Sequence, residues 1–179
     1  GANDSGSSSG LLLELARVLK QTARLKNNIR LVFLDGEECV NEYTHSDGLH
    51  GSRRLAARIM EMAEKKKVKA VVVVDMIGDR DLSITIPNNS SPELVHLLFE
   101  SSKEEGLRSK FSFLGSEMLD DHSPFLAAGI KAIDIIDFQY GSAPKKNDYW
   151  HTAEDSIDKI SAESLQSIGR VVIRLVNKM

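Results

Sequence analysis

Apolar residues recur at helical spacing in four stretches of the chain. These stretches are residues 8–24, 55–63, 94–99 and 165–176. Spacings of three and four residues place the apolar side chains on one side of a helix, so each stretch predicts a helix packed against a core. Ser91 is the expected N-cap of the third helix, with Pro92 at the first helical position, where its missing N–H costs nothing. The last helix is expected to follow Ser161.

Four short runs are apolar without helical spacing and are rich in β-branched residues. They cover residues 29–34, 70–74, 82–86 and 132–136. Such runs are typical of strands that are covered on both faces, as in a sheet flanked by helices. Strands and helices alternate along the chain without internal repeats. This order predicts an α/β fold with three αβα layers and a largely parallel central sheet.

The composition is that of one globular unit. A chain of 179 residues with 41% hydrophobic and 27% charged residues can bury a substantial core, so we interpret residues 1–179 as a single domain. The net charge of −3 comes from acids and bases that are mixed along the sequence. Only residues 65–67 form a run of like charge, which we interpret as a solvated helix end. We therefore expect no nucleic-acid partner.

Cysteine usage and hydropathy argue against an internal disulfide, a membrane span and a signal peptide. Cys39 is the only cysteine, so an internal disulfide is impossible and the redox compartment is not indicated. No run reaches the roughly 18 apolar residues of a membrane span, and the first residues are not those of a signal peptide. The chain starts abruptly in a loop with candidate chemistry, so we expect that upstream sequence is missing.

Candidate catalytic residues lie where predicted strands end. Glu37 and Glu38 follow the run at residues 29–34, and Asp75 follows the valine run at residues 70–74. Ligands of largely parallel sheets bind at the carboxyl ends of the strands. We therefore expect these three carboxylates to gather at one edge of the sheet.

Two loops supply further candidates for the same edge. Asp4 lies in GANDSGSSSG just before the first helix, and His151 lies in the turn DYWHT. Carboxylate oxygens and imidazole nitrogens are ligands that zinc accepts. Neighbouring side chains after a strand point in different directions, so Glu38 can bind the metal while Glu37 stays nearby as a general base. The sequence thus predicts a zinc site with Asp4, Glu38, Asp75 and His151 as ligands.

Each of these residues also has an ordinary explanation. The two glutamates can form a solvated turn, the Gly/Ser loop can be a flexible linker, and His151 can be a surface residue. Asp75 can cap a turn, and Asp79 competes with it as a ligand. Trp150, however, lies in a polar loop, where a tryptophan usually packs against another group. This favours a role for the neighbouring His151 as a metal ligand. His45, His50 and His96 are expected at the surface or in the core. The ordinary explanation for His122 is a hydrogen bond near a helix cap formed by Asp120 and Asp121, although two adjacent acids suggest more than a cap.

In this order and spacing, the motifs resemble those of the zinc-dependent aminopeptidase family that also contains the glutaminyl cyclases. GANDSGSSSG is similar to the loop with the metal-bridging aspartate, and FLDGEE to the motif with the general base followed by a zinc ligand. VVDMIGD is similar to the strand end with an aspartate for a second metal, and YWHT to the turn with the last histidine ligand. The resemblance covers essentially the whole chain. It implies a zinc exopeptidase (phosphorylase/hydrolase-like) fold, peptide or protein N-termini as substrates, and a secreted or periplasmic location.

Two departures from the family pattern bear on the activity. The dinuclear aminopeptidases have one more histidine ligand upstream of the Asp4 loop, so this chain offers four of five ligands and resembles the fold without its N-terminal part. The segments GLHGSRRLAARI and DDHSPFLAAGI are closer to the cyclases, in which an acid at the position of Asp120 joins the network around the base. Trp150 stands where cyclases have an aromatic wall, and Tyr43 where they often have a tryptophan, which implies substrate contacts for both.

The resemblance leaves three hypotheses. The favoured one is an aminopeptidase with one or two zinc ions, in which Glu37 transfers a proton from the attacking water to the leaving amine. The alternative is a glutaminyl cyclase with one zinc, in which Glu37 transfers a proton from the α-amine to departing ammonia while Asp120 and Asp75 share the network. A metal-free binding domain is the third, and the presence of Glu37 argues against it.

Overall fold

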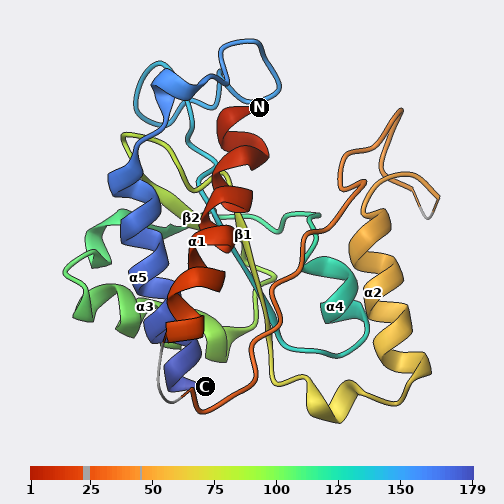
Figure 1. Cartoon of the computed structure of the whole chain (residues 1–179). Helices are drawn as coiled ribbons and strands as arrows, with labels where there is room; N and C mark the ends of the chain where they lie inside the picture. Colours follow the sequence, from red (N-terminus) through yellow and green to blue (C-terminus); the bar gives the residue numbers. More distant parts are fainter. Residues whose placement is uncertain (22–24, 45) are drawn as a thin grey trace.

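A central sheet separates two layers of helices (Figure 1). The computed structural model describes residues 1–21, 25–44 and 46–179. Helices α1 (Ser8–Gln21), α3 (Pro92–Glu104) and α5 (Ala162–Lys178) lie on one face of the sheet, and α2 (His50–Glu61) and α4 (Ser123–Ala127) lie on the other. The short helical segments are η1 (Ala2–Ser7), η2 (Lys65–Lys67), η3 (Arg108–Lys110) and η4 (Ile157–Lys159). This arrangement confirms the predicted three-layer α/β fold.

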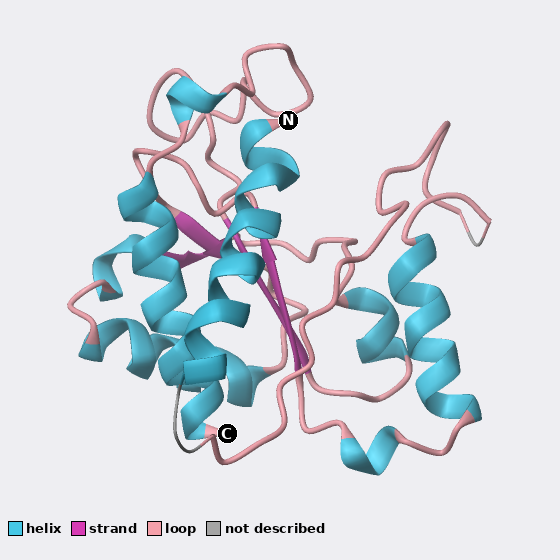
Figure 2. Cartoon of the chain, viewed as in Figure 1, coloured by secondary structure: helices cyan, strands magenta, loops and turns pink. Residues whose placement is uncertain are grey.

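The strands of the sheet, shown in magenta in Figure 2, are mostly parallel. In the described part of the chain their order is β1-β4-β2-β3. β1 (Val71–Asp75) runs parallel to β4 (Ala132–Ile136), and β2 (Ile84–Ile86) runs parallel to β3 (Phe111–Phe113). β2 and β4 are antiparallel. Because the last residues of β1 and β4 are in register, the segments that follow these two strands meet at the same edge.

Apolar cores on both faces of the sheet hold the helices in place. The larger core includes Leu15 of α1, Leu98 of α3 and Ile168 of α5. The smaller core includes Ile59 of α2 and Phe125 of α4. Full burial of one such side chain contributes about 1.5–3 kcal/mol. The amphipathic faces seen in the sequence are therefore what fixes the layers.

Most predicted elements are found close to their expected positions. The first helix extends to Gln21, and residues 22–24 of its predicted range lie outside the described part. Ser161 caps α5 by accepting a hydrogen bond from the amide of Ser164 at 3.1 Å. Ser91 precedes α3 as predicted, but its hydroxyl accepts the amide hydrogen of Ala132 instead of capping the helix. No described helix has the length and apolar character needed to span a membrane.

The predicted strand at residues 29–34 is wrong. Within the described residues, this segment pairs with no strand of the sheet. Leu31 packs on the larger core, whereas Phe33 is 56% exposed. A β-branched apolar run predicts extended backbone and burial, but a strand also needs a neighbour for its hydrogen bonds. Conversely, β3 was not predicted, because three residues are too few to show a period.

Candidate metal centre

Asp4 lies on a loop that is fixed to the end of β1. Its backbone angles (φ −102°, ψ 95°) interrupt the helical turns of η1 just before α1 begins. The side-chain oxygen of Asn3 accepts a hydrogen bond from the amide of Gly78 at 2.7 Å. The hydroxyl of Ser7 accepts one from the amide of Ile77 at 3.2 Å. Both amides follow β1, so the Asp4 loop is positioned at the carboxyl end of the sheet.

Glu37 and Glu38 lie on a turn that is tied to the start of α2. Three successive carbonyl groups of the turn accept hydrogen bonds from amides at the start of α2, at 2.8 to 2.9 Å. Gly36 in this turn has a φ of +58°, and a Cβ atom there would lie 3.1 Å from the ring of His50. The turn therefore requires glycine. The turn fixes the backbone that carries Glu37 and Glu38 relative to α2.

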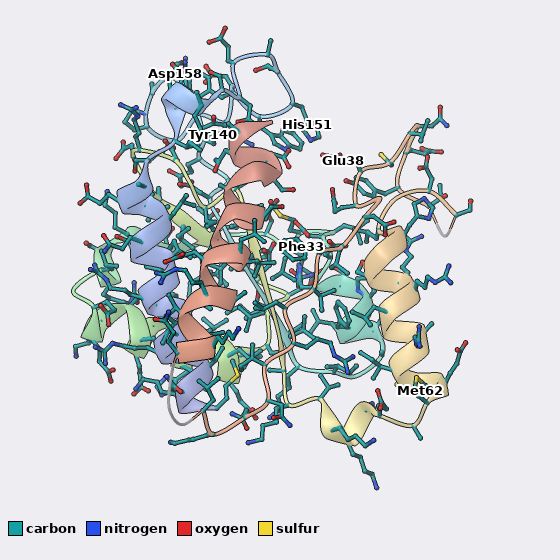
Figure 3. All side chains as sticks on the ribbon, in the orientation of Figure 1. Phe33, Glu38, Met62, Tyr140, His151 and Asp158 are labelled. Carbon is teal, nitrogen blue, oxygen red and sulfur yellow. The ribbon has the colours of Figure 1, made fainter. Side chains whose placement is uncertain are left out.

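Three of the predicted ligands converge on one point. Nε2 of His151 lies 2.6 Å from Oε1 of Glu38 and 3.4 Å from Oδ2 of Asp4. One ligand atom from each residue lies within 4.8 Å of the other two. Figure 3 shows Glu38 and His151 extending toward one another from separate loops. Residues from both ends of the chain thus form one cluster of two oxygens and one nitrogen.

The imidazole of His151 is oriented by its turn and by aromatic packing. His151 has a φ of +56°, a conformation that residues other than glycine rarely adopt. Its ring stacks on Trp150, with centroids 3.8 Å apart and planes inclined by 27°. Trp150 in turn packs edge-on against Phe138 at 5.1 Å. These contacts direct Nε2 toward the two carboxylates.

The cluster fits a zinc ion. Three protein ligands made of carboxylate and imidazole groups are characteristic of catalytic zinc sites, which keep one position open for water or substrate. The pKa of Asp4 is raised, first by burial and then by the charge of Glu38. A bound cation would relieve this repulsion and keep the carboxylate ionised. Asp4, Glu38 and His151 are therefore the residues that would hold the metal.

Asp75 lies beside this cluster rather than within it. It is the last residue of β1, and its carboxylate accepts a hydrogen bond from the next amide at 2.9 Å. Burial, followed by the charges of Asp120 and Asp4, raises its pKa well above the usual value. Its role as a ligand stays a prediction. Its competitor Asp79 forms an isolated β-bridge with Ile160 and does not belong to the cluster.

Glu37, the predicted general base, lies next to Glu38 on the same turn. Its Oε1 accepts a hydrogen bond from the hydroxyl of Tyr43 at 3.0 Å. Burial and then the charge of Asp120 raise the pKa of Glu37 to about 7, while the Tyr43 hydrogen bond acts to lower it. A carboxylate that titrates near neutrality is suited to general base catalysis. The substrate contacts implied for Tyr43 and Trp150 stay predictions.

A second, buried group lies next to these carboxylates and consists of Asp120, His122 and Asp134. Ligand atoms of the three residues lie within 4.8 Å of one another. His122 and Asp134 are fully buried, and their polar side-chain atoms have no hydrogen-bond partner among the described residues. Nδ1 of His122 is 3.9 Å from Oδ2 of Asp134, which is beyond hydrogen-bond distance. The predicted hydrogen bond of His122 near a helix cap is therefore wrong.

Burial determines the protonation of this group. It raises the pKa values of Asp120 and Asp134 and lowers the pKa of His122 to about 4, so the imidazole is neutral at pH 7. The charge of Asp120 contributes to the raised pKa values of both Glu37 and Asp75. The buried group is therefore electrostatically coupled to Glu37 through Asp120.

Three residues around the site were not predicted from the sequence. Asp134 is an acid between isoleucines in β4, an unusual residue for a buried strand that could have drawn attention. Tyr140 and Asp155 hydrogen-bond to each other at 2.9 Å beneath the Asp4 loop and had no sequence signal. The remaining histidines lie elsewhere: His50 begins α2, His96 pairs with Glu100 on α3, and His45 is outside the described residues.

Sequence comparison returns relatives with two activities. The profile of Peptidase family M28 matches residues 1–176. A glutaminyl-peptide cyclotransferase of Dictyostelium discoideum is 26% identical over 201 residues, covering 97% of this chain and 54% of the relative. Aminopeptidase YwaD of Bacillus subtilis is 32% identical over 181 residues, covering 98% of this chain and 37% of the relative. The chain thus spans about half the length of these curated relatives or less.

Solved structures show the same pair of activities. The glutaminyl cyclase of an Acidobacteriales bacterium matches with a TM-score of 0.91 and 41% identity, over 99% of this chain and 62% of that one. BSAP, a zinc aminopeptidase from Bacillus subtilis, matches with a TM-score of 0.79 and 29% identity, over 99% of this chain and 42% of that one. Both matches agree with the predicted zinc exopeptidase fold. Because the family profile covers nearly every residue, the chain belongs to peptidase family M28.

Proposed function

We propose that this chain carries the zinc-binding and catalytic residues of a glutaminyl cyclase, which converts an N-terminal glutamine into pyroglutamate and releases ammonia. The observation that carries the proposal is the division of the acidic residues into two groups. Asp4 and Glu38 converge with His151 on a single point. Asp75 and Asp120 instead interact with Glu37 through their charges, and their pKa values are raised by burial. One metal beside a proton-holding network is what cyclisation requires.

The reaction needs a polarised amide and a proton transfer. A zinc ion held by the three convergent ligands would act as a Lewis acid on the side-chain amide of the substrate glutamine. The α-amino nitrogen attacks the amide carbon, a new C–N bond forms, and the bond to the departing nitrogen breaks. Glu37 accepts the proton from the α-amine and delivers it to the leaving nitrogen, so that ammonia departs. Its pKa of about 7 allows it to act in both directions.

Aromatic residues near the cluster suit an N-terminal substrate. Trp150 is stacked on His151, so its indole lies directly beside a ligand. Tyr43 is 38% exposed, and its hydroxyl already contacts Glu37. With substrate bound, a side wall at this place would help to exclude water, which cyclisation requires because its nucleophile belongs to the substrate. The 41% identity to a solved glutaminyl cyclase supports the same assignment.

Aminopeptidase activity, the hypothesis favoured by the sequence motifs, is the second candidate. It is supported by the 32% identity to aminopeptidase YwaD and by the position of Asp75, whose charge interacts with that of Asp4. In that case Glu37 would take the proton of an attacking water and return it to the leaving amine. We rank it below cyclisation because the identity to a solved glutaminyl cyclase is 41%, whereas the identity to the solved zinc aminopeptidase is 29%.

A single assay with two substrates separates these activities. The protein is incubated with one peptide that begins with glutamine and another that begins with leucine, and zinc is counted by elemental analysis. Cyclisation predicts ammonia release from the first peptide, no free leucine from the second, and one tightly bound zinc ion per chain. Free leucine together with two zinc ions would replace the cyclase by the aminopeptidase.

A further inference from the structure

The carboxylate of Asp155 lies nearly buried beneath the Asp4 loop, with its side chain only 4% exposed. It accepts three hydrogen bonds from groups outside its own turn. Oδ1 accepts from the amide of Asn3 at 2.7 Å and from the hydroxyl of Tyr140 at 2.9 Å, and Oδ2 accepts from the amide of Asp4 at 3.1 Å. The backbone carbonyl of Asp155 also accepts the amide hydrogen of Ala2 at 3.2 Å.

These hydrogen bonds join two parts of the chain that supply metal ligands. Asp155 follows His151 by four residues, and the turn between them is closed by hydrogen bonds from Thr152 to Tyr149 and from Asp155 to Thr152. Asp4, the proposed ligand at the other end, donates its amide hydrogen directly to the same carboxylate. The contacts of Asn3 and Ser7 described above tie the Asp4 loop to β1, whereas Asp155 ties it to the turn of His151.

We propose that Asp155 is a positioning residue of the metal centre, which holds Asp4 at the distance from His151 that lets one ion bind both. Asp155 does not touch the metal in this arrangement. It acts by accepting the amide hydrogens of the Asp4 loop, and bonds to an ionised acceptor are stronger than bonds between neutral groups. The inference rests on the proposed zinc site but not on which reaction the site performs.

The tyrosine that contacts Asp155 completes the support. Tyr140 is fully buried, packs against Tyr149 with ring centroids 5.3 Å apart, and directs its hydroxyl at Oδ1. Figure 3 labels Tyr140 near His151 at the same end of the molecule. The position of the Asp155 carboxylate is thus determined from both sides, by the loop that it holds and by a rigid aromatic side chain.

The test replaces Asp155 by asparagine, which has the same shape. An amide has one acceptor oxygen, so its NH₂ group must face the amide hydrogen of Asp4 in one orientation or that of Asn3 in the other. Loss of such support for a ligand typically weakens metal binding by about 10–100-fold. We expect that loss in the zinc dissociation constant, measured by chelator competition at a temperature where circular dichroism shows the variant to be folded.

Two further variants make the result specific. Asp158→Asn is the matched control on the same segment, because among the described residues the Asp158 side chain accepts hydrogen bonds from Ser156 and Lys159 alone and is 65% exposed. It should bind zinc like the parent. Tyr140→Phe removes one donor to Asp155 and leaves both amides, so it should weaken zinc binding less than Asp155→Asn does. If Asp155→Asn does not fold, the zinc dissociation constant of Tyr140→Phe decides the test.

Opposite outcomes would overturn the inference. A folded Asp155→Asn variant with the parent's zinc dissociation constant would show that Asp155 supports only the fold, even if its melting temperature falls. If only Tyr140→Phe folds, unchanged zinc binding in that variant would likewise show that the contact between Tyr140 and Asp155 does not support the metal centre. A parent protein that binds no zinc would overturn the proposed site as well, which distinguishes failure of the proposed function from failure of this inference.

Discussion

Replacement of Glu37 by glutamine should remove most of the turnover and leave zinc bound. The amide has nearly the size of the carboxylate, and its oxygen can still accept the hydrogen bond that Tyr43 gives at 3.0 Å. It cannot take up the substrate proton. General acid–base catalysis contributes about 10²–10⁴-fold to the rate. Each factor of ten corresponds to about 1.36 kcal/mol, so the barrier should rise by about 3–5 kcal/mol.

The assay for this variant is ammonia release from a peptide that begins with glutamine, with zinc content measured in parallel. Glu42→Gln is the matched control, because Glu42 is an exposed glutamate on the same loop. In the parent, kcat/KM should rise with pH as Glu37 loses its proton, since only the carboxylate accepts one. The pKa of Glu37 is about 7 in the metal-free chain and is lowered by a bound cation, so the rise should be centred at or below about pH 7.

Two results would refute the reasoning. If Glu37→Gln turns over substrate at the parental rate, Glu37 is not the proton acceptor. If the variant loses its zinc, then the side chain is a metal ligand and the roles assigned to the two adjacent glutamates are reversed. The control keeps these results distinct from a general effect on the loop.

Four other substitutions test separate parts of the account. His151→Ala should lose zinc in elemental analysis, because water replaces one of three protein ligands, and retention of zinc would place His151 outside the metal shell. Asp120→Ala should abolish ammonia release while zinc remains, and full activity would exclude Asp120 from the proton network. Tyr43→Phe removes a hydrogen bond that lowers the pKa of Glu37, so the rise of kcat/KM should move to higher pH, and an unmoved profile would contradict the contact. Ile168→Ala should cost about 2–5 kcal/mol in urea unfolding because the side chain is fully buried in the larger core, and a cost under about 1 kcal/mol would contradict that packing.

The strands were predictable where burial on both faces leaves a long, nearly continuous apolar run in the sequence. The valine run of β1 and the isoleucines of β4 are found within one residue of their predicted positions, since strands covered on both faces must be apolar throughout. The same logic fails for residues 29–34, because an apolar pattern reports burial and not the presence of a pairing strand. It also fails for β3, whose FSF sequence is too short to show a period.

The sequence predicted which side chains of the site would converge but not the residues that support them. Glu38 was expected at the carboxyl edge of the sheet because it follows an apolar run, and Asp4 and His151 because their loops can reach that edge. The run before Glu38 is not a strand, yet the three side chains do converge. Asp75 was placed at that edge correctly, as the last residue of β1, and its role as a ligand stays a prediction. Asp155 has no pattern of its own, since its role depends on amides of a loop about 150 residues away in the chain. Such partners become visible only when the chain is folded.

The central claim is that one zinc ion is held by Asp4, Glu38 and His151. A crystal structure of the zinc-loaded protein, with anomalous scattering recorded at the zinc absorption edge, tests it most directly. We expect one anomalous peak, at about 2.0–2.2 Å from an oxygen of each carboxylate and from Nε2 of His151. Glu37 and Asp75 should not touch the ion. Two peaks bridged by Asp4, with Asp75 bound to the second, or a peak away from these residues, would contradict the account.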